Sequence, residues 1–213
     1  MRHIFLSTFL IWLNYRHQTW RILPRYLKAL IYIAFINSSY YYFFKRHILW
    51  ELQSNSLNLK QLRVVHIFFI TPLIFLLCMA KFPEEDIRLQ MKHILKWSFK
   101  CALVEFFGEK FNMIYFKNGW NIFWSWSIYI FLFSYGYLFT TKPKFVWKLS
   151  IPTLLFFLLK FKAPFRKALL LGPLLLVWKR AQTPKWFNVI KSYYTNCFSQ
   201  YIFIMQRKKA PKV

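Results

Sequence analysis

Long apolar runs separated by short polar segments make up most of the chain. The runs cover residues 3–14, 27–44, 64–80, 93–108, 120–140 and 145–160. A membrane-spanning helix needs about 20 mostly apolar residues, or somewhat fewer when residues at its ends reach toward the surface. The first run is short, so the pattern predicts an all-α integral membrane bundle of five to six transmembrane helices within residues 1–165.

Proline and glycine mark the breaks in this pattern. Pro83 and Asn118-Gly119 lie in two of the polar segments. Pro72 lies inside the third run, where its ring removes a backbone donor and crowds the preceding turn, so a kink is expected there. No small-x-small cleavage site follows the first run, which we therefore expect to be retained.

Residues 166–213 follow a different pattern. The apolar stretch 168–178 is only half the length of a span, and Gly172-Pro173 interrupts it. It is expected to form a short hairpin arm or a seventh, re-entrant segment. From Trp186 to Met205, apolar residues recur at three- and four-residue steps with polar residues between them. This predicts a basic amphipathic C-terminal helix that lies on anionic lipid, or a docking surface for a protein partner.

Composition and charge favour a membrane setting over a nucleic-acid partner. The 213 residues are 57% hydrophobic and carry a formal net charge of +25. A soluble nucleic-acid-binding protein would be polar between its aromatic residues, whereas this chain is apolar there. With six spans, the side that holds both termini carries more Lys and Arg, so the C-terminal tail is predicted to be cytoplasmic. The expected surroundings are anionic lipid and a membrane-protein partner, without nucleic acid.

Tryptophan marks the start of the fifth run. Asn118-Gly119 predicts a polar turn, and Asn121 is placed to cap the following helix. Trp rings favour the headgroup level of a membrane. The predicted interfacial anchors are Trp120, Trp124, Trp147, Trp178 and Trp186. The alternative is an aromatic wall that binds a lipid or sugar headgroup, made of Trp120 and Trp124 with Asn118.

Glu105 is an ionisable residue inside the fourth run. A carboxyl group at membrane depth faces the bundle interior, pairs, or stays protonated. One interpretation is a proton or ligand site, and the other is a structural ion pair with Lys96, Lys100 or a histidine. The acidic cluster 84–86 follows Pro83, where it is expected to cap a helix.

Motifs for catalysis, metals and cofactors are missing from the sequence. There is no P-loop, no GxGxxG, no GxSxG and no HExxH, and the three cysteines are far apart. We therefore predict no cofactor and no metal site. The sequence neither establishes nor excludes an enzyme, and we lean toward a protein without catalytic activity.

The core of the chain resembles a family of small uncharacterised multipass membrane proteins of spore-forming Gram-positive bacteria, the bacilli and clostridia. The resemblance covers residues 10–162 and rests on an acidic residue, a Tyr, an Asn-Gly-Trp turn, a Trp-Ser pair, and later Lys-Pro, Trp and Leu-Ser. These fall on Glu105, Tyr115, Asn118, Gly119, Trp120, Trp124, Ser125, Lys142, Pro143, Trp147, Leu149 and Ser150. The chain departs from the pattern at Phe123, where a Trp is common, and at Tyr129, where the family usually has an acidic residue. The resemblance implies a helical protein of the cytoplasmic membrane and no catalytic residues.

Three functions remain open from the sequence. The leading hypothesis is a non-enzymatic multipass protein of the cell envelope that binds a membrane partner or lipid. The alternative is a small carrier, or a substrate-binding subunit of a transporter, that uses Glu105. A membrane-embedded enzyme is the weaker alternative. Gly occurs only four times, so large aromatic side chains, not small residues, are expected to fill the bundle.

Overall fold

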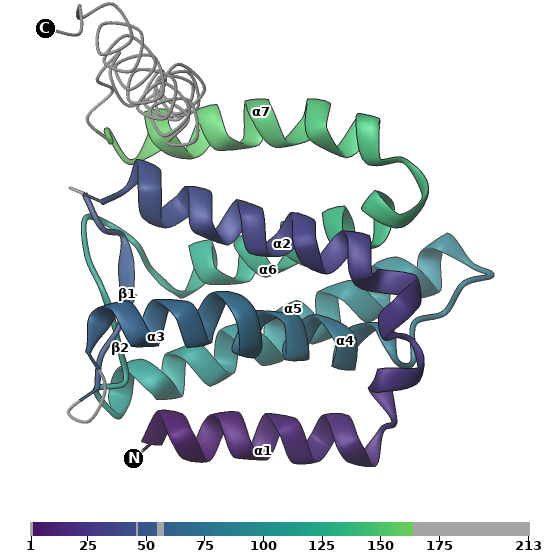
Figure 1. Cartoon of the computed structure of the whole chain (residues 1–213). Coiled ribbons are helices and arrows are strands. Elements are labelled where there is room, and N and C mark those ends of the chain that lie inside the picture. The colour runs from purple at the N-terminus through teal and green to yellow at the C-terminus, as the bar shows by residue number, and fades with distance from the viewer. Residues whose placement is uncertain (1, 46, 55–57, 164–213) are drawn as a thin grey trace, which may run out of the picture. The chain divides into compact units, whose positions relative to one another are not determined.

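The computed structural model describes residues 2–45, 47–54 and 58–163, which are mostly helical (Figure 1). The predicted hairpin arm and amphipathic tail lie outside these residues. The longer helices are α1 (Arg2–Arg16), α2 (Leu23–Phe43), α3 (Leu59–Val65), α4 (Thr71–Met79), α5 (Ile87–Lys110), α6 (Ile122–Thr141) and α7 (Pro143–Lys160). A 3₁₀ turn, η1 (Thr19–Arg21), precedes α2, and a π-helical turn, η2 (His66–Ile70), joins α3 to α4.

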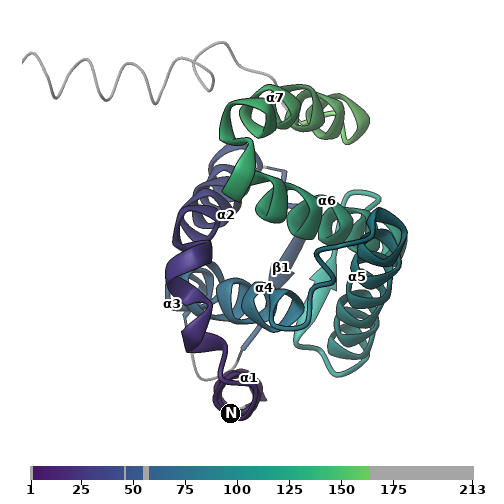
Figure 2. The ribbon, with the colours of Figure 1, turned by 90° about the vertical axis from the view of Figure 1, so that its right-hand side faces the viewer.

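The helices lie side by side, and successive long helices run in opposite directions, with α3, η2 and α4 forming one rod (Figure 1). Figure 2 shows the bundle along the helices, with α2, α4, α5 and α6 around a common centre. The outer helices are α1, which packs against α4, and α7, which packs against α6. All six predicted apolar runs are confirmed as helices.

Side-chain caps explain where two of these helices begin. The Asp86 carboxylate accepts from the backbone N–H of Arg88 at 2.8 Å, so α5 starts six residues before its apolar run. The Asn121 side chain accepts from the backbone N–H groups of Phe123 and Trp124 at 3.1 and 3.3 Å, which confirms the predicted cap of α6. Each cap satisfies backbone donors that have no partner within the helix.

Two helices in the described part of the chain are long and apolar enough to cross a membrane: Leu59–Met79 and Ile122–Thr141. A core helix of a soluble protein passes the same test when it is buried. The most apolar window of the first helix is 56% buried, whereas that of the second is only 17% buried. An apolar helix left largely uncovered by its own fold supports association with a membrane.

Two short strands add a feature that the all-α prediction missed. β1 (Trp50–Leu52) pairs antiparallel with β2 (Ile114–Phe116), with Glu51 opposite Tyr115. The strands join the segment after α2 to the segment after α5, at the end of the bundle opposite the 81–86 loop (Figure 1). The fold is therefore helical with a two-stranded sheet across one end.

The helix type changes just before Pro72, where the sequence predicts a kink. Pro72 lies in the first turn of α4. The five residues before α4 form the π turn. A wider turn of this kind is a common way for a helix to absorb a disruption.

The core is aromatic, as predicted, but one glycine is essential to it. Tyr26, Phe75 and Phe133 are its largest fully buried side chains. A Cβ atom placed on Gly136 would lie 2.4 Å from Cε2 of Phe75 and 3.1 Å from Cδ1 of Ile33. Gly136 thus allows α6 to approach both α4 and α2, which corrects the expectation that small residues play no part.

We predict that Gly136→Ala lowers the free energy of unfolding by about 1–3 kcal/mol, because the added methyl group overpacks a buried aromatic contact. Thermal or denaturant unfolding in detergent measures this. The matched control is Ser127→Ala on the same helix, which adds no atoms at an exposed hydroxyl. Equal stability of the two variants would contradict the close approach.

Candidate functional site

The two-stranded sheet anchors the end of α2. The Tyr40 hydroxyl donates to the carbonyl of Trp50 at 2.9 Å and accepts from the backbone N–H groups of Leu49 and Trp50 at 3.2 and 3.1 Å. The Tyr40 ring also stacks on the Trp50 ring, with centroids 5.5 Å apart. One side chain therefore fixes the turn that leads from α2 into β1.

An ion pair connects β1 to α3. Glu51 is 3% exposed and accepts from both Nε and Nη2 of Arg63, with the Nε contact at 2.8 Å. The Arg63 guanidinium also lies 5.1 Å from the centre of the Tyr41 ring. A buried carboxylate needs such a partner, because leaving it unpaired costs much more than the pair contributes.

The predicted Asn118-Gly119 turn is confirmed. Both residues have positive φ angles, 54° and 83°, and the Asn118 amide donates to the carbonyl of Ile48 at 2.7 Å. Asn118 is itself exposed. The turn ties the segment before α6 to the segment before β1, so its role in the structure is to position the chain.

Trp120, a predicted interfacial anchor, is buried in the bundle. Its side chain is only 6% exposed, and its ring packs against those of Phe157 and Phe161 in α7 and the residues just after it. Its Nε1 donates to Oγ of Ser125 at 3.0 Å. Trp as a residue type favours a membrane interface. In this fold, however, the turn before Trp120 leaves its ring inside the bundle.

The other predicted anchors divide into two groups. Trp124 is half-buried against Phe161, with Lys160 Nζ 5.7 Å from its ring centre. Trp147, another predicted anchor, is 41% exposed and packs against Phe35. Trp178 and Trp186 lie outside the described residues.

Glu105 faces the bundle interior without a cation. It is 8% exposed, and its Oε1 accepts from the Tyr129 hydroxyl at 2.7 Å, while the Ser125 hydroxyl also interacts with it. None of the predicted cationic partners pairs with it: Lys100, for example, extends over the Trp97 ring at 5.1 Å. Neutral hydroxyl donors on α6 therefore replace the ion pair expected from the sequence.

The structure brings together three of the four predicted ligand-binding residues. Trp120 and Glu105 are linked through Ser125, since its hydroxyl accepts from Trp120 and interacts with Glu105. This polar chain connects α5 to α6. Trp124 packs against the same two rings as Trp120, those of Phe157 and Phe161, whereas Asn118 belongs to the turn.

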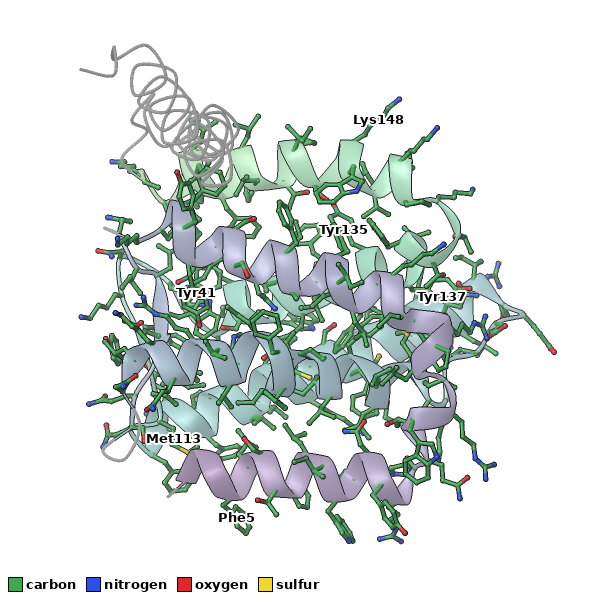
Figure 3. All side chains as sticks on the ribbon, viewed as in Figure 1. Phe5, Tyr41, Met113, Tyr135, Tyr137 and Lys148 are labelled. Carbon is green, nitrogen blue, oxygen red and sulfur yellow. The ribbon has the colours of Figure 1, made fainter. Side chains whose placement is uncertain are left out.

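One cleft lies elsewhere, between α2, α6 and α7. Its volume is about 340 Å³, and its lining is almost wholly apolar and aromatic. Its residues include Phe35, Phe44, Trp120, Phe131, Tyr135, Trp147, Leu154 and Phe157. Figure 3 shows Tyr135 in the layer between α2 and α7. Of the predicted ligand-binding residues, only Trp120 lines this cleft.

Hydroxyl pairs hold the walls of this cleft. The Tyr32 and Ser150 hydroxyls are 2.7 Å apart, joining α2 to α7, and those of Tyr135 and Thr153 are 2.9 Å apart, joining α6 to α7. Sequence analysis missed the cleft. The available signal was a pair of hydroxyl residues three positions apart on one face of α7, Ser150 and Thr153. That this face turns inward becomes visible only when the helices are placed.

A second cleft, of about 260 Å³, lies between α1 and the helices α4, α5 and α6. It is also mostly apolar, and Lys100, Cys101 and Tyr129 contribute to it. Both cysteines in the described residues are buried and free. Among those residues, no three His, Cys, Asp or Glu side chains are grouped so as to hold a metal ion.

The acidic cluster lies at the opposite end of the bundle from the sheet. Arg25 Nη1 donates to Glu84 Oε1 at 2.5 Å, and this hydrogen bond lowers the pKa of Glu84. Both side chains are about half exposed, so the pair contributes little to stability. Together with the cap from Asp86, this gives the cluster a structural role.

The chain matches no protein-family model, no curated protein and no solved structure.

We predict that Tyr129→Phe lowers the free energy of unfolding by about 1–3 kcal/mol, because it leaves a buried carboxyl group without its donor. Unfolding in detergent measures the effect. Tyr135→Phe is the matched control, since its hydroxyl pairs with a neutral partner at a cleft wall. A smaller loss for Tyr129→Phe than for the control would show that Glu105 does not depend on this hydroxyl.

For the sheet, we predict that Arg63→Met lowers the free energy of unfolding by about 3 kcal/mol, because Glu51 stays buried without its cation. Glu51→Gln combined with Arg63→Met should recover part of that loss, since no unpaired charge remains. A double variant as unstable as Arg63→Met alone would argue against the ion pair as the cause.

Proposed function

We propose that this chain is a multipass membrane protein that binds a bilayer lipid in the cleft between α2, α6 and α7. The observation that carries the proposal is the cleft itself, with a volume of about 340 Å³ and a lining that is almost wholly apolar. On α2 it extends from Tyr32 to Phe44, a length of about 18 Å. These dimensions suit one acyl chain.

The outer surface of the bundle supports the membrane part of the proposal. Large apolar side chains are exposed on α1, α2, α5, α6 and α7, including Phe9 on α1, Phe35 on α2, Phe107 on α5 and Leu159 on α7. Figure 3 shows Phe5 of α1 directed away from the bundle. In water such a surface would drive association, whereas lipid tails cover it at no cost. The alternating directions of the helices suit six crossings, and α6 supplies the clearest span.

The distribution of charge supports an anionic lipid. Lys45 directly follows Phe44 at one end of the cleft, and Lys160 and Lys162 lie at the end of α7 beside Phe161; all three lysines are exposed. Phosphate groups favour such a cluster. In the proposed orientation this end, together with the C-terminal region, faces the cytoplasm.

Binding accounts for the arrangement better than transport or catalysis. A carrier that uses Glu105 needs a polar cavity beside that residue, but its hydrogen bonds go to the Tyr129 and Ser125 hydroxyls, and the cleft to which Tyr129 contributes is mostly apolar. Glu105 lines neither of the two clefts. The resemblance to uncharacterised multipass membrane proteins of spore-formers agrees with this proposal and adds no reaction to it.

The test compares two neighbouring leucines of α7. Leu154 lines the cleft, whereas Leu155 is 40% exposed on the outer surface. We expect Leu154→Trp to fill the cleft and to reduce the phospholipid that remains bound after detergent extraction at least fivefold. Leu155→Trp should retain the native amount. Native mass spectrometry or phosphorus analysis of the purified protein measures the bound lipid.

Thermal unfolding of both variants shows whether each keeps its fold. Equal lipid retention by two folded variants would contradict a lipid site in the cleft. A monodisperse protein that needs no detergent would contradict the membrane location as well.

A further inference from the structure

Four basic side chains lie on one face of α5 at four-residue steps. Arg88, Lys92, Lys96 and Lys100 are all exposed and are here called the basic stripe. Residues four apart on an α-helix lie one above another on the same face. At a rise of 1.5 Å per residue, the basic stripe extends about 18 Å along the helix.

Contacts that involve α5 and α6 show which part of α6 lies at the same level as the basic stripe. Near one level, Phe82 packs against both His93 of α5 and Tyr137 of α6, with centroid distances of 5.6 and 4.4 Å. At another level, Tyr129 of α6 donates to Glu105 of α5. The part of α5 between these levels holds the last two lysines of the basic stripe. Lys96 and Lys100 therefore lie at the same level as the middle of α6, a candidate membrane span.

These lysines have no anionic partner. Both ion pairs in the described part of the chain involve other residues. Lys100 lines the second cleft, and its Nζ lies 5.1 Å from the centre of the Trp97 ring. It lies ten residues from the nearer end of α5, about 15 Å, which is farther than a lysine side chain extends. An ionised group at membrane depth is costly unless a partner neutralises it.

The chain itself cannot supply that partner, either in this molecule or in a second copy. It has six acidic residues in all: Glu51, Glu84, Glu85, Asp86, Glu105 and Glu109. Two of them are buried with partners inside the bundle, three precede α5, and the last is at its C-terminal end. No acidic residue occurs in residues 164–213. No copy of this chain therefore offers a row of carboxylates at the depth of the basic stripe.

We propose that the basic stripe docks a membrane-embedded helix of a different protein, which carries carboxylates at three- or four-residue steps. The proposal rests on the multipass arrangement proposed above and does not depend on lipid in the cleft. Leu95, Phe99 and Leu103 are exposed on the same side of α5 and provide apolar contact around the charges. Paired charges in an apolar medium fix the register and the choice of partner.

The experiment uses the purified full chain in phosphatidylcholine vesicles with a synthetic polyleucine transmembrane peptide. One form of the peptide has three Glu at four-residue steps, and the other has Gln at the same positions. Energy transfer between labelled protein and labelled peptide measures binding. We expect the Glu peptide to bind at least tenfold more tightly than the Gln peptide. Equal binding of the two peptides would overturn the proposal.

Two double variants show whether the basic stripe is responsible. Lys96→Gln/Lys100→Gln should lose the preference for the Glu peptide. Lys144→Gln/Lys148→Gln is the matched control, because these lysines are also exposed and four residues apart, on α7. In Figure 3, Lys148 points away from the bundle. The control should bind within twofold of the native chain. An equal loss in both variants would mean that net charge, not the basic stripe, selects the peptide.

Two further outcomes separate the alternatives. If phosphatidylglycerol displaces the Glu peptide from the native chain but not from the control, the occupant is anionic lipid and the helix-docking proposal fails. If Lys100→Cys reacts with a membrane-impermeant maleimide in vesicles without peptide, this part of α5 faces water. Both the docking proposal and the multipass placement then fail. Protection of that cysteine without any peptide preference overturns the docking proposal alone.

Discussion

The position of α6 is the constraint on which the rest of the structure depends. This helix packs against α2, α4, α5 and α7, and it approaches α4 and α2 closely because Gly136 leaves room for Phe75 and Ile33. From this position, Tyr129 reaches Glu105 and Tyr135 reaches Thr153. The core, the polar chain and the walls of the cleft therefore follow from one close packing arrangement.

Polar groups in this bundle serve mainly to connect helices. Glu105 is held by α6, Glu51 by α3, and the Tyr40 hydroxyl by three backbone groups of the β1 segment. Each satisfied group fixes the rotation of a helix about its axis, which apolar contacts alone leave less specific. The unpaired cations of the basic stripe on α5 are the exception, and this contrast is why that face suits a partner.

Much of the fold can be predicted from the sequence, since its determinants are local. Apolar runs locate the helices, and the turn at Asn118-Gly119 and the cap at Asn121 follow from the preferences of single residues. The pairing of β1 with β2 could not be predicted, because three residues in each strand meet across a separation of more than sixty residues. Short strands without an alternating pattern carry little signal of their own.

The candidate site was less predictable for a related reason. Its properties depend on how each helix is rotated, so Trp120 points inward and Glu105 meets Tyr129 instead of a lysine. The cleft combines residues of three helices, none of which has a distinctive pattern by itself. A sequence reveals that a carboxyl group or a Trp is present, but the side chains around it are determined by tertiary packing.

The sidedness of the two ends of the bundle tests the account most directly. Glu85 and Lys117 are exposed in loops at opposite ends, so single cysteines at these positions, in a chain without other cysteines, report where each end lies. In sealed vesicles of uniform orientation, a membrane-impermeant maleimide added outside should label one position, and the other should react only after the vesicles are opened. Labelling of both positions from the outside would contradict a bundle that crosses the membrane.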